Sequence, residues 1–249
     1  MAKYAVATIA YNEAEIIGAC IRNWKGLVDK HLVLVSSKPW NGKSYPDDGT
    51  ADIARKLGAE VVVGDWTTEA FQRNEGLAIL YDYDYVLIVD PDELYEKETQ
   101  QNILKALNKP IDISWRSDKH LQAFRIEHIK TYWKTTDYTV DPEDHHKPIV
   151  AVDPKQLICH EHRQFGADYV PIIKGTCHHV SWVKSDEKVK EKIQSYSHAD
   201  AIEKEWYQNV WKEWKPGSGL QVKPYFTEKD KAIATYSPAP QEILDLLRP

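Results

Sequence analysis

Cysteine is scarce in this 249-residue chain, which contains only Cys20, Cys159 and Cys177. A small, odd number of cysteines argues against a disulfide-stabilised secreted scaffold and favours a reducing compartment, so we expect a cytoplasmic protein. A zinc site is a poor interpretation of residues 159–162 (Cys-His-Glu-His), because no second cysteine pair lies at ligand spacing. The cysteines are therefore expected to pack in the core.

Long apolar runs and an excess of basic residues are also missing. No run approaches the roughly 18 residues that a membrane span needs, so we expect no transmembrane segment. Lysine and arginine total 32 against 38 acidic residues, a formal net charge of −6, and no basic block occurs. Nucleic acid is therefore not an expected partner. With 42% hydrophobic and 28% charged residues, the composition is that of a globular protein.

The first hundred residues alternate between strand-like and helix-like patterns. Asn12 is predicted to cap the first helix, with Glu15 in the capping-box position and Gly26 at the end. Continuous apolar strands that alternate with helices imply an α/β fold with a mostly parallel sheet flanked by helices. The predicted strands are 4–10, 31–35, 60–63 and 85–89, and the other predicted helices are 50–57, 68–80 and 97–107.

The second half of the chain has a different character. Strands are predicted over 121–129 and 149–152. From Ser185 to Trp214, apolar residues recur every three or four positions, which predicts one long helix with a single apolar stripe. Because the halves differ in type, we expect one compact domain in two parts, residues 1–110 and 111–249.

Polar residues follow each predicted parallel strand, at the edge where open α/β sheets bind ligands. The sharpest group is Asp90-Pro91-Asp92-Glu93, after the fourth strand. Two aspartates at the end of a buried strand repel one another unless a cation neutralises them, and their hard oxygens suit Mg²⁺ or Mn²⁺. The alternative is that Asp92 only caps the helix over 97–107. Since no glycine-rich phosphate loop follows the first strand, a bound diphosphate would need a metal or basic side chains.

Five segments then occur in order along residues 4–95: Val6–Glu13, Asp48–Thr50, Gly58–Val62, Arg73–Gly76 and Tyr85–Glu93. Together they resemble nucleotide-sugar glycosyltransferases of the GT-A fold, family 2 in particular. The resemblance implies a GT-A, Rossmann-like sheet in which residues 1–110 bind the nucleotide sugar and residues 111–249 bind the acceptor. It implies that the donor-binding residues are Tyr11, Asn12, Glu13, Asp48, Arg73 and Asp90. The segment 36–46 is inserted relative to the family, so Ser36 or Lys38 is an alternative to Asp48.

The same resemblance implies a metal site. In the Asp-x-Asp motif of these enzymes Asp90 faces the ribose or sugar, and Asp92 ligates Mn²⁺ or Mg²⁺. In a subset of them a histidine after the sheet is a third ligand, which matches His178 or His179. Neighbouring residues of an extended chain point in opposite directions, so at most one of the two can ligate, and we choose His179.

The resemblance also implies a carboxylate base, an Asp at the end of a Glu-Asp pair. The nearest match is Glu143-Asp144, and its competitors are Asp137, Asp141 and Glu161. Lys184 and Lys192 are candidates to neutralise the departing diphosphate, and Trp133, Tyr138 and Trp182 are candidate platforms for a sugar ring.

Together these expectations describe a metal-dependent glycosyltransferase. It would move a sugar from a UDP- or GDP-sugar to a hydroxyl acceptor, with a glycan as the expected acceptor and with inversion. The alternatives are a nucleotidyltransferase of similar fold, whose glycine- and basic-rich signature is missing from residues 10–18, and a non-catalytic carbohydrate-binding or scaffold protein.

Overall fold

The N-terminal half of the computed structural model alternates strands and helices. The structure describes residues 2–108, 122–143, 147–167, 169–195, 202–223 and 231–248. The predicted boundary at residues 110 and 111 lies outside these ranges. The elements are β1 (Tyr4–Ala10), α1 (Ile17–Trp24), β2 (Lys30–Ser36), α2 (Thr50–Lys56), β3 (Glu60–Gly64), α3 (Glu69–Ile79), β4 (Tyr85–Ile88), β5 (Glu93–Tyr95) and α4 (Lys97–Asn108).

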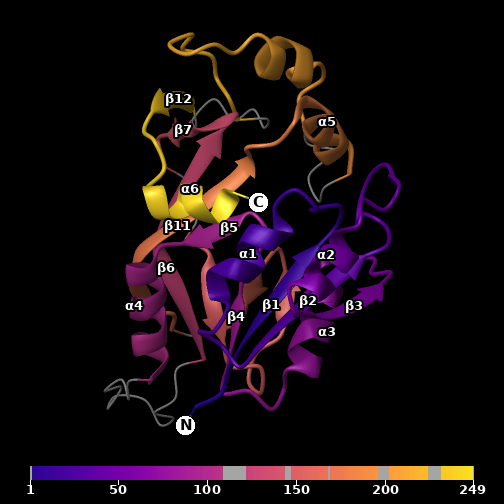
Figure 1. The fold of residues 1–249 in the computed structure, drawn as a ribbon, viewed down its shortest axis with the longest axis vertical. Helices are drawn as coiled ribbons and strands as arrows, with labels where there is room; N and C mark the ends of the chain where they lie inside the picture. The colour runs from indigo at the N-terminus through magenta and orange to yellow at the C-terminus, as the bar shows by residue number, and fades with distance from the viewer. Residues whose placement is uncertain are drawn as a thin grey trace.

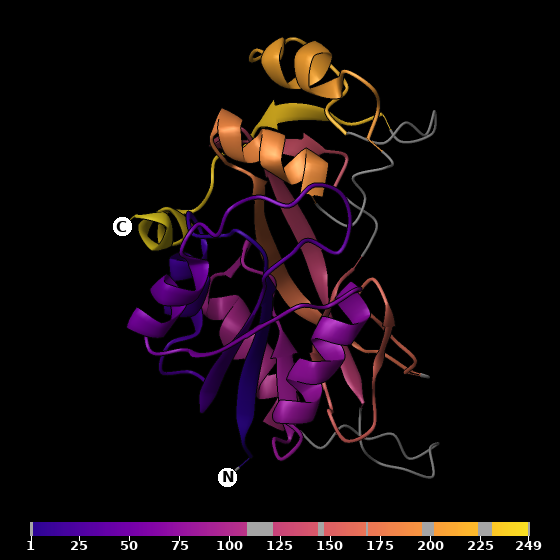
Figure 2. The ribbon, with the colours of Figure 1, turned by 90° about the vertical axis from the view of Figure 1, so that its right-hand side faces the viewer.

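Strands β3, β2, β1 and β4 pair in this order, and every pairing is parallel. Alternate side chains of β1 enter two different cores: Tyr4 and Val6 pack with residues of α1 and α4, whereas Ala7 packs with residues of α3. Figure 2 shows helices on both sides of the sheet. The strand is continuously apolar because both of its faces are covered. The predicted α/β class, with a central sheet flanked by helices, is therefore confirmed.

The second half extends this sheet, mainly with antiparallel strands. The sheet order is β12-β7-β6-β8-β4-β1-β2-β3, and β11 pairs with β6 and β5. A separate two-stranded hairpin is formed by β9 and β10. The bounds are β6 (Ala123–Trp133), β7 (Thr135–Asp141), β8 (Ile149–Val152), β9 (Cys159–Glu161), β10 (Gln164–Phe165), β11 (Ile172–Trp182), α5 (Asp186–Ser195), the π-helix η2 (Tyr207–Lys212), β12 (Ile233–Tyr236) and α6 (Gln241–Leu247).

Two predictions about helices are wrong. Helix α1 begins at Ile17, and Asn12 does not cap it, since its backbone has a φ of 51° and its side chain donates to the Pro46 carbonyl. The single long helix from residue 185 is also wrong: α5 ends at Ser195, and residues 202–205 are not helical. The apolar stripe is periodic because its tryptophans gather around Trp133, which stacks edge-on against several of them, not because one helix carries them all.

Helix α5 lies beyond the carboxyl ends of the parallel strands, at the end of the molecule away from the N-terminus (Figure 1). Strand β11 runs past β5 toward the same region. The fold thus brings a helix and a strand from the second half of the chain to the edge where α/β sheets bind ligands. In the part of the chain that the structure describes, no helix has both the length and the apolar character needed to cross a membrane.

Candidate active site

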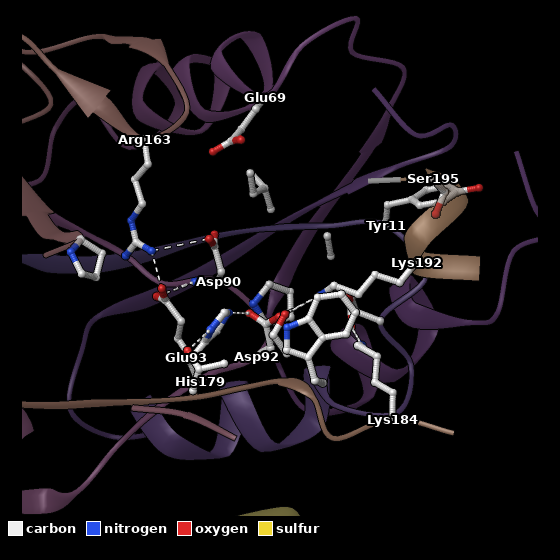
Figure 3. Close-up of a pocket in the computed structure, with 18 of the residues that line it drawn as sticks. Tyr11, Glu69, Asp90, Asp92, Glu93, Arg163, His179, Lys184, Lys192 and Ser195 are labelled. Carbon is white, nitrogen blue, oxygen red and sulfur yellow. Dashed lines mark hydrogen bonds and ion pairs between the residues drawn. The ribbon is translucent and has the colours of Figure 1, made fainter. Parts of the chain in front are cut away.

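A cavity of about 700 Å³ opens at the carboxyl ends of β1 and β4 (Figure 3). The loop after β1 contributes Tyr11, Asn12 and Glu13 to its lining, and the loop after β4 contributes Asp90 to Glu93. Strand β11 adds His179 and Ser181, and α5 adds Lys188, Glu191 and Lys192. Parallel strands end at one edge of the sheet, so residues far apart in the sequence meet there.

Asp90 is held by two buried arginines. Arg73 of α3 donates from Nη2 to both carboxylate oxygens, at 2.9 and 3.0 Å, and from Nε to Glu69 at 2.8 Å. The Nη1 of Arg163 lies 3.5 Å from Asp90 Oδ2 and also pairs with Glu93 (Figure 3). Burial alone would lower the pKa of Arg163, but the carboxylates of Glu93 and Asp90 hold it well above its usual range. Both arginines therefore stay charged and fix Asp90 in one orientation.

Asp92 faces a histidine and a lysine. His179 Nε2 lies 3.5 Å from Oδ1, and Lys192 Nζ lies 3.4 Å from Oδ2. Burial would raise the pKa of Asp92, but His179 and Lys192 hold it well below its usual range. Strand β5 separates Asp92 from α4, so Asp92 does not cap that helix. The pair was expected to need a cation, and in the structure the protein's own basic groups neutralise it.

The two neighbouring histidines of β11 point to opposite sides of the strand. His179 reaches Asp92, whereas His178 lies against Tyr132 and Glu96, with Nδ1 2.9 Å from the Tyr132 hydroxyl and Nε2 3.1 Å from Glu96. His178 is 3% exposed and does not line the cavity. The structure therefore excludes His178 from the group around Asp92 and brings His179 into it.

Three lysines at intervals of four residues connect α5 to the loops that follow three parallel strands. Lys184, just before α5, pairs with Glu13 after β1. Lys188 lies 2.9 Å from Asp48 after β2, and Lys192 pairs with Asp92 after β4. Lys188 and Lys192 are four residues apart on α5 and so share one face of the helix. All three lysines line the cavity.

Asp48, which was predicted to bind the donor, is bonded to residues of α2, α5 and the loop after β1. Its carboxylate accepts bonds from Lys188, from Thr50 and from the Ala14 backbone, and it does not line the cavity. Burial would raise the pKa of Asp48, but the hydrogen bonds from Thr50 and Lys188 outweigh it and lower that pKa below its usual value. Asp48 therefore joins α5 to the loop after β2.

The inserted loop packs against α5. Its Gly42 packs so closely on α5 that an added Cβ would lie 2.0 Å from the Gln194 carbonyl oxygen. The Lys43 amide donates to the same carbonyl at 2.7 Å, and the Tyr45 hydroxyl donates to the Gln194 side chain at 2.6 Å. The insertion thus ties the C-terminal end of α5 to the first half of the chain.

Ser36 and Lys38, the alternatives to Asp48, are also directed elsewhere. The Ser36 hydroxyl donates to the Lys38 carbonyl, and the Lys38 ammonium pairs with Asp65 at 2.7 Å on the surface. Neither residue lines the cavity. Of the insertion, Pro39 and Trp40 reach the lining instead, and Trp40 donates its indole N–H to Gln72 at 2.8 Å.

The hairpin β9–β10 supplies lining residues that the sequence analysis did not single out. Its two-residue turn is His162-Arg163, with φ values of 40° and 59°, where Asn-Gly is the usual pair. A left-handed conformation costs about 1–2 kcal/mol per non-glycine residue. Arg163 compensates by entering the core, where it pairs with Glu93 and donates to the Ile88 and Ile149 carbonyls. The run 159–162 gave only a poor zinc signal, so no pattern pointed to Arg163.

Of the Glu143-Asp144 pair that was predicted to supply the catalytic base, Glu143 does not line the cavity. Glu143 accepts the Ile129 backbone N–H and lies 3.3 Å from His128 Nδ1. Asp144 lies outside the described residues. The competitors Asp137, Asp141 and Glu161 do not line the cavity either.

The three aromatic residues predicted as platforms for a sugar ring pack mainly against other aromatic side chains. Trp133 is 0% exposed and stacks with Trp182 and Trp211. Trp133 and Trp182 reach the cavity from one end, but Tyr138 does not line it. Ile129, Val140 and Val222 add apolar side chains to the lining.

A full protein-made metal site is missing from the described residues: no three His, Cys, Asp or Glu side chains are grouped to hold an ion. Asp92 and His179 nevertheless offer a carboxylate and an imidazole 3.5 Å apart. Mg²⁺ usually binds one or two carboxylates and completes its shell with water and substrate phosphate oxygens. The pair therefore fits a divalent ion that arrives with a phosphorylated ligand.

Comparisons with known proteins give a partial match. No family model matches the chain. It is 32% identical over 103 residues to an uncharacterised glycosyltransferase of Rickettsia felis, and 31% identical over 101 residues to one of Rickettsia conorii. Each match covers 41% of this chain and 33% of the relative, so the chain matches about a third of their length. The predicted resemblance to glycosyltransferases is confirmed over the matched segment.

Similarity to solved structures is weak. Glucosyl-3-phosphoglycerate synthase from Mycobacterium tuberculosis, solved with Mn²⁺, UDP and glucosyl-3-phosphoglycerate, has a TM-score of 0.45 at 14% identity, covering 95% of this chain and 88% of that one. HddC from Yersinia pseudotuberculosis has a TM-score of 0.38 at 10% identity, covering 75% and 97%. Both TM-scores are low, so neither likeness supports a function for this chain.

Proposed function

We propose that this protein is a glycosyltransferase that moves a sugar from a UDP- or GDP-sugar to an acceptor hydroxyl, with inversion and with a glycan as acceptor. The observation that carries the proposal is the cavity in which Asp90, Asp92 and three lysines meet at the carboxyl ends of the parallel strands. Similarity to the two Rickettsia proteins named as glycosyltransferases supports the same activity.

The lysines suit the departing diphosphate. Transfer breaks the bond between the anomeric carbon and a phosphate oxygen, so negative charge grows on the leaving group. Lys184, Lys188 and Lys192 present ammonium groups along one wall of the cavity, with side chains 6%, 17% and 16% exposed. Positive charges in such a water-poor site stabilise a developing anion more than they would in water.

The donor's sugar and nucleoside are assigned to Asp90 and to the loop after β1. Asp90 is fixed by Arg73 and Arg163, so its carboxylate can accept bonds from sugar hydroxyls without losing conformational freedom on binding. Tyr11, Asn12 and Glu13 line the cavity after β1 and are proposed to contact the nucleoside.

A divalent ion, Mn²⁺ or Mg²⁺, would be held by Asp92 and His179, whose donor atoms suit it. When bound, it would supply Lewis-acid stabilisation of the leaving diphosphate. Lys192 now lies 3.4 Å from Asp92 and would remain near enough to share the diphosphate charge.

Titration calorimetry with UDP and GDP, with and without MnCl₂, tests this function. We expect binding that Mn²⁺ strengthens, and Asp92→Asn should remove the Mn²⁺-dependent part. The matched control is Asp65→Asn, a carboxylate that pairs with Lys38 on the surface, and it should bind as the wild type does. If neither nucleotide binds the wild type, with or without Mn²⁺, the proposed function is wrong.

A further inference from the structure

We propose that His162 is the general base that takes the proton from the acceptor hydroxyl, and that Glu69 positions it. This inference rests on the proposed glycosyl transfer and assigns the proton transfer that direct displacement requires. The residues concerned come from the strained turn of the β9–β10 hairpin and from the first turn of α3.

The carboxylates of the cavity are poorly suited to this step. A carboxylate that already accepts from a basic side chain must give up part of that pairing to take a proton from an acceptor. Every described Asp or Glu that lines the cavity has such a partner. The pairs are Glu13 with Lys184, Glu69 with Arg73, Asp90 with Arg73 and Arg163, Asp92 with His179 and Lys192, Glu93 with Arg163, and Glu191 with Lys188.

Two described imidazoles line the cavity, and they differ in their neighbours. His179 is next to Asp92 and Lys192 and belongs to the diphosphate end. His162 lies at the Glu69 end, with its side chain 43% exposed, so an acceptor hydroxyl can reach it. Imidazole is the side chain that most often serves as a general base.

Glu69 is placed to orient the ring. Its Oε2 lies 3.6 Å from His162 Nδ1, and its Oε1 accepts from Arg73 at 2.8 Å. Contacts of this kind are often longer before a substrate binds. With its proton on Nδ1 toward Glu69, the ring keeps the Nε2 lone pair for the acceptor. Nε2 now lies 3.3 Å from Glu161, whose side chain is 73% exposed and can be displaced.

The hairpin is anchored so that this position is fixed. The Asn74 side chain of α3 donates to the Cys159 carbonyl at 2.8 Å and accepts the Cys159 N–H at 2.7 Å. Arg163, next to His162, is tied to Glu93, Asp90 and two backbone carbonyls. Left-handed backbone at non-glycine residues persists where the surroundings over-determine it, and it is concentrated at functional sites. The strained turn therefore places His162 in the cavity while Arg163 fills the core.

In the proposed step, the acceptor oxygen forms a bond to the anomeric carbon as its proton moves to His162 Nε2. The bond from that carbon to the diphosphate oxygen breaks, and its electron pair leaves with the diphosphate. The imidazolium, stabilised by Glu69, then returns its proton to solvent.

The test uses release of UDP or GDP from a set of UDP- and GDP-sugars, with water as the acceptor, together with UDP and GDP binding. His162→Asn removes the base, and asparagine tolerates the left-handed backbone, so the fold is expected to persist. We expect kcat to fall about 10²- to 10⁴-fold, with KM and nucleotide affinity within about three-fold of wild type. The fall of kcat at acid pH should disappear as well. Glu69 of α3 and Glu161 of the hairpin are charged groups that face His162, so Glu69→Gln should shift this limb.

Two further variants make the result decisive. His160→Gln, in the same hairpin but outside the cavity lining, should keep wild-type kcat. His162→Gly should regain activity when imidazole is added, which a purely structural residue would not do. Normal nucleotide binding with a His162→Asn kcat within about three-fold of wild type would overturn this inference alone. A wild type that neither binds a nucleotide nor releases one would overturn the proposed function and the inference together.

Discussion

Replacing Arg163 by methionine should be among the most destabilising single changes in this protein. Arg163 is 7% exposed and pairs with Glu93, whose side chain is 4% exposed. Methionine keeps the apolar length of the side chain but leaves Glu93 as a buried carboxylate without its guanidinium. Removing one partner of a buried pair costs about 3–5 kcal/mol. For a chain of this size we expect Tm to fall by roughly 6–20 °C.

Thermal and urea unfolding, followed by circular dichroism, measure this loss. The double variant Arg163→Met/Glu93→Gln removes both charges and should recover about 1 kcal/mol or more of it, since the unpaired carboxylate is gone. Lys30→Met is the control: it breaks an exposed pair with Glu60, at 2.7 Å, and should cost less than about 1 kcal/mol. If Arg163→Met costs no more than Lys30→Met, the reasoning about the buried arginine is refuted.

Two other predictions concern the inserted loop and a buried histidine. In urea unfolding, Gly42→Ala should destabilise the protein by about 1–3 kcal/mol more than Gly26→Ala. The two glycines have similar φ values, 77° and 79°, but only a Cβ at position 42 would meet the Gln194 carbonyl. Equal losses would show that the loop does not pack on α5. Burial lowers the pKa of His31 to about 4, so the unfolded chain binds its proton more readily and stability falls as pH drops from about 6.5 to about 4. The wild type should lose about 3 kcal/mol more over this range than His31→Gln, and parallel stability curves for the two proteins would contradict this.

The sequence predicted much of the parallel sheet because its signals are local. Residues 85–88 are apolar throughout and residues 4–10 are apolar except for Thr8, because both faces of a central parallel strand are covered. This pattern shows in the chain itself. The position of Asp90 and Asp92 followed from it, because a residue just past such a strand lies at the ligand-binding edge. The opposite directions of His178 and His179 likewise follow from extended backbone alone.

The charges that surround these carboxylates were decided by the tertiary structure. Arg163 reaches Asp90 across 73 positions and Lys188 reaches Asp48 across 140, and no local pattern records either pairing. The aromatic stripe after residue 185 was misinterpreted for a related reason, since spacing of three or four residues shows burial but not whether one helix carries it.

The sequence by itself therefore determined where the parallel strands end and which acidic residues follow them. The reason is that burial on both faces of a strand requires apolar residues along it. Only the folded structure decided which basic groups neutralise those acids, that Asp48, which is outside the cavity lining, pairs with Lys188, and that a strained turn directs His162 into the cavity. The physical reason is that a charge pair depends on distance in space, whereas apolar periodicity depends on distance along the chain.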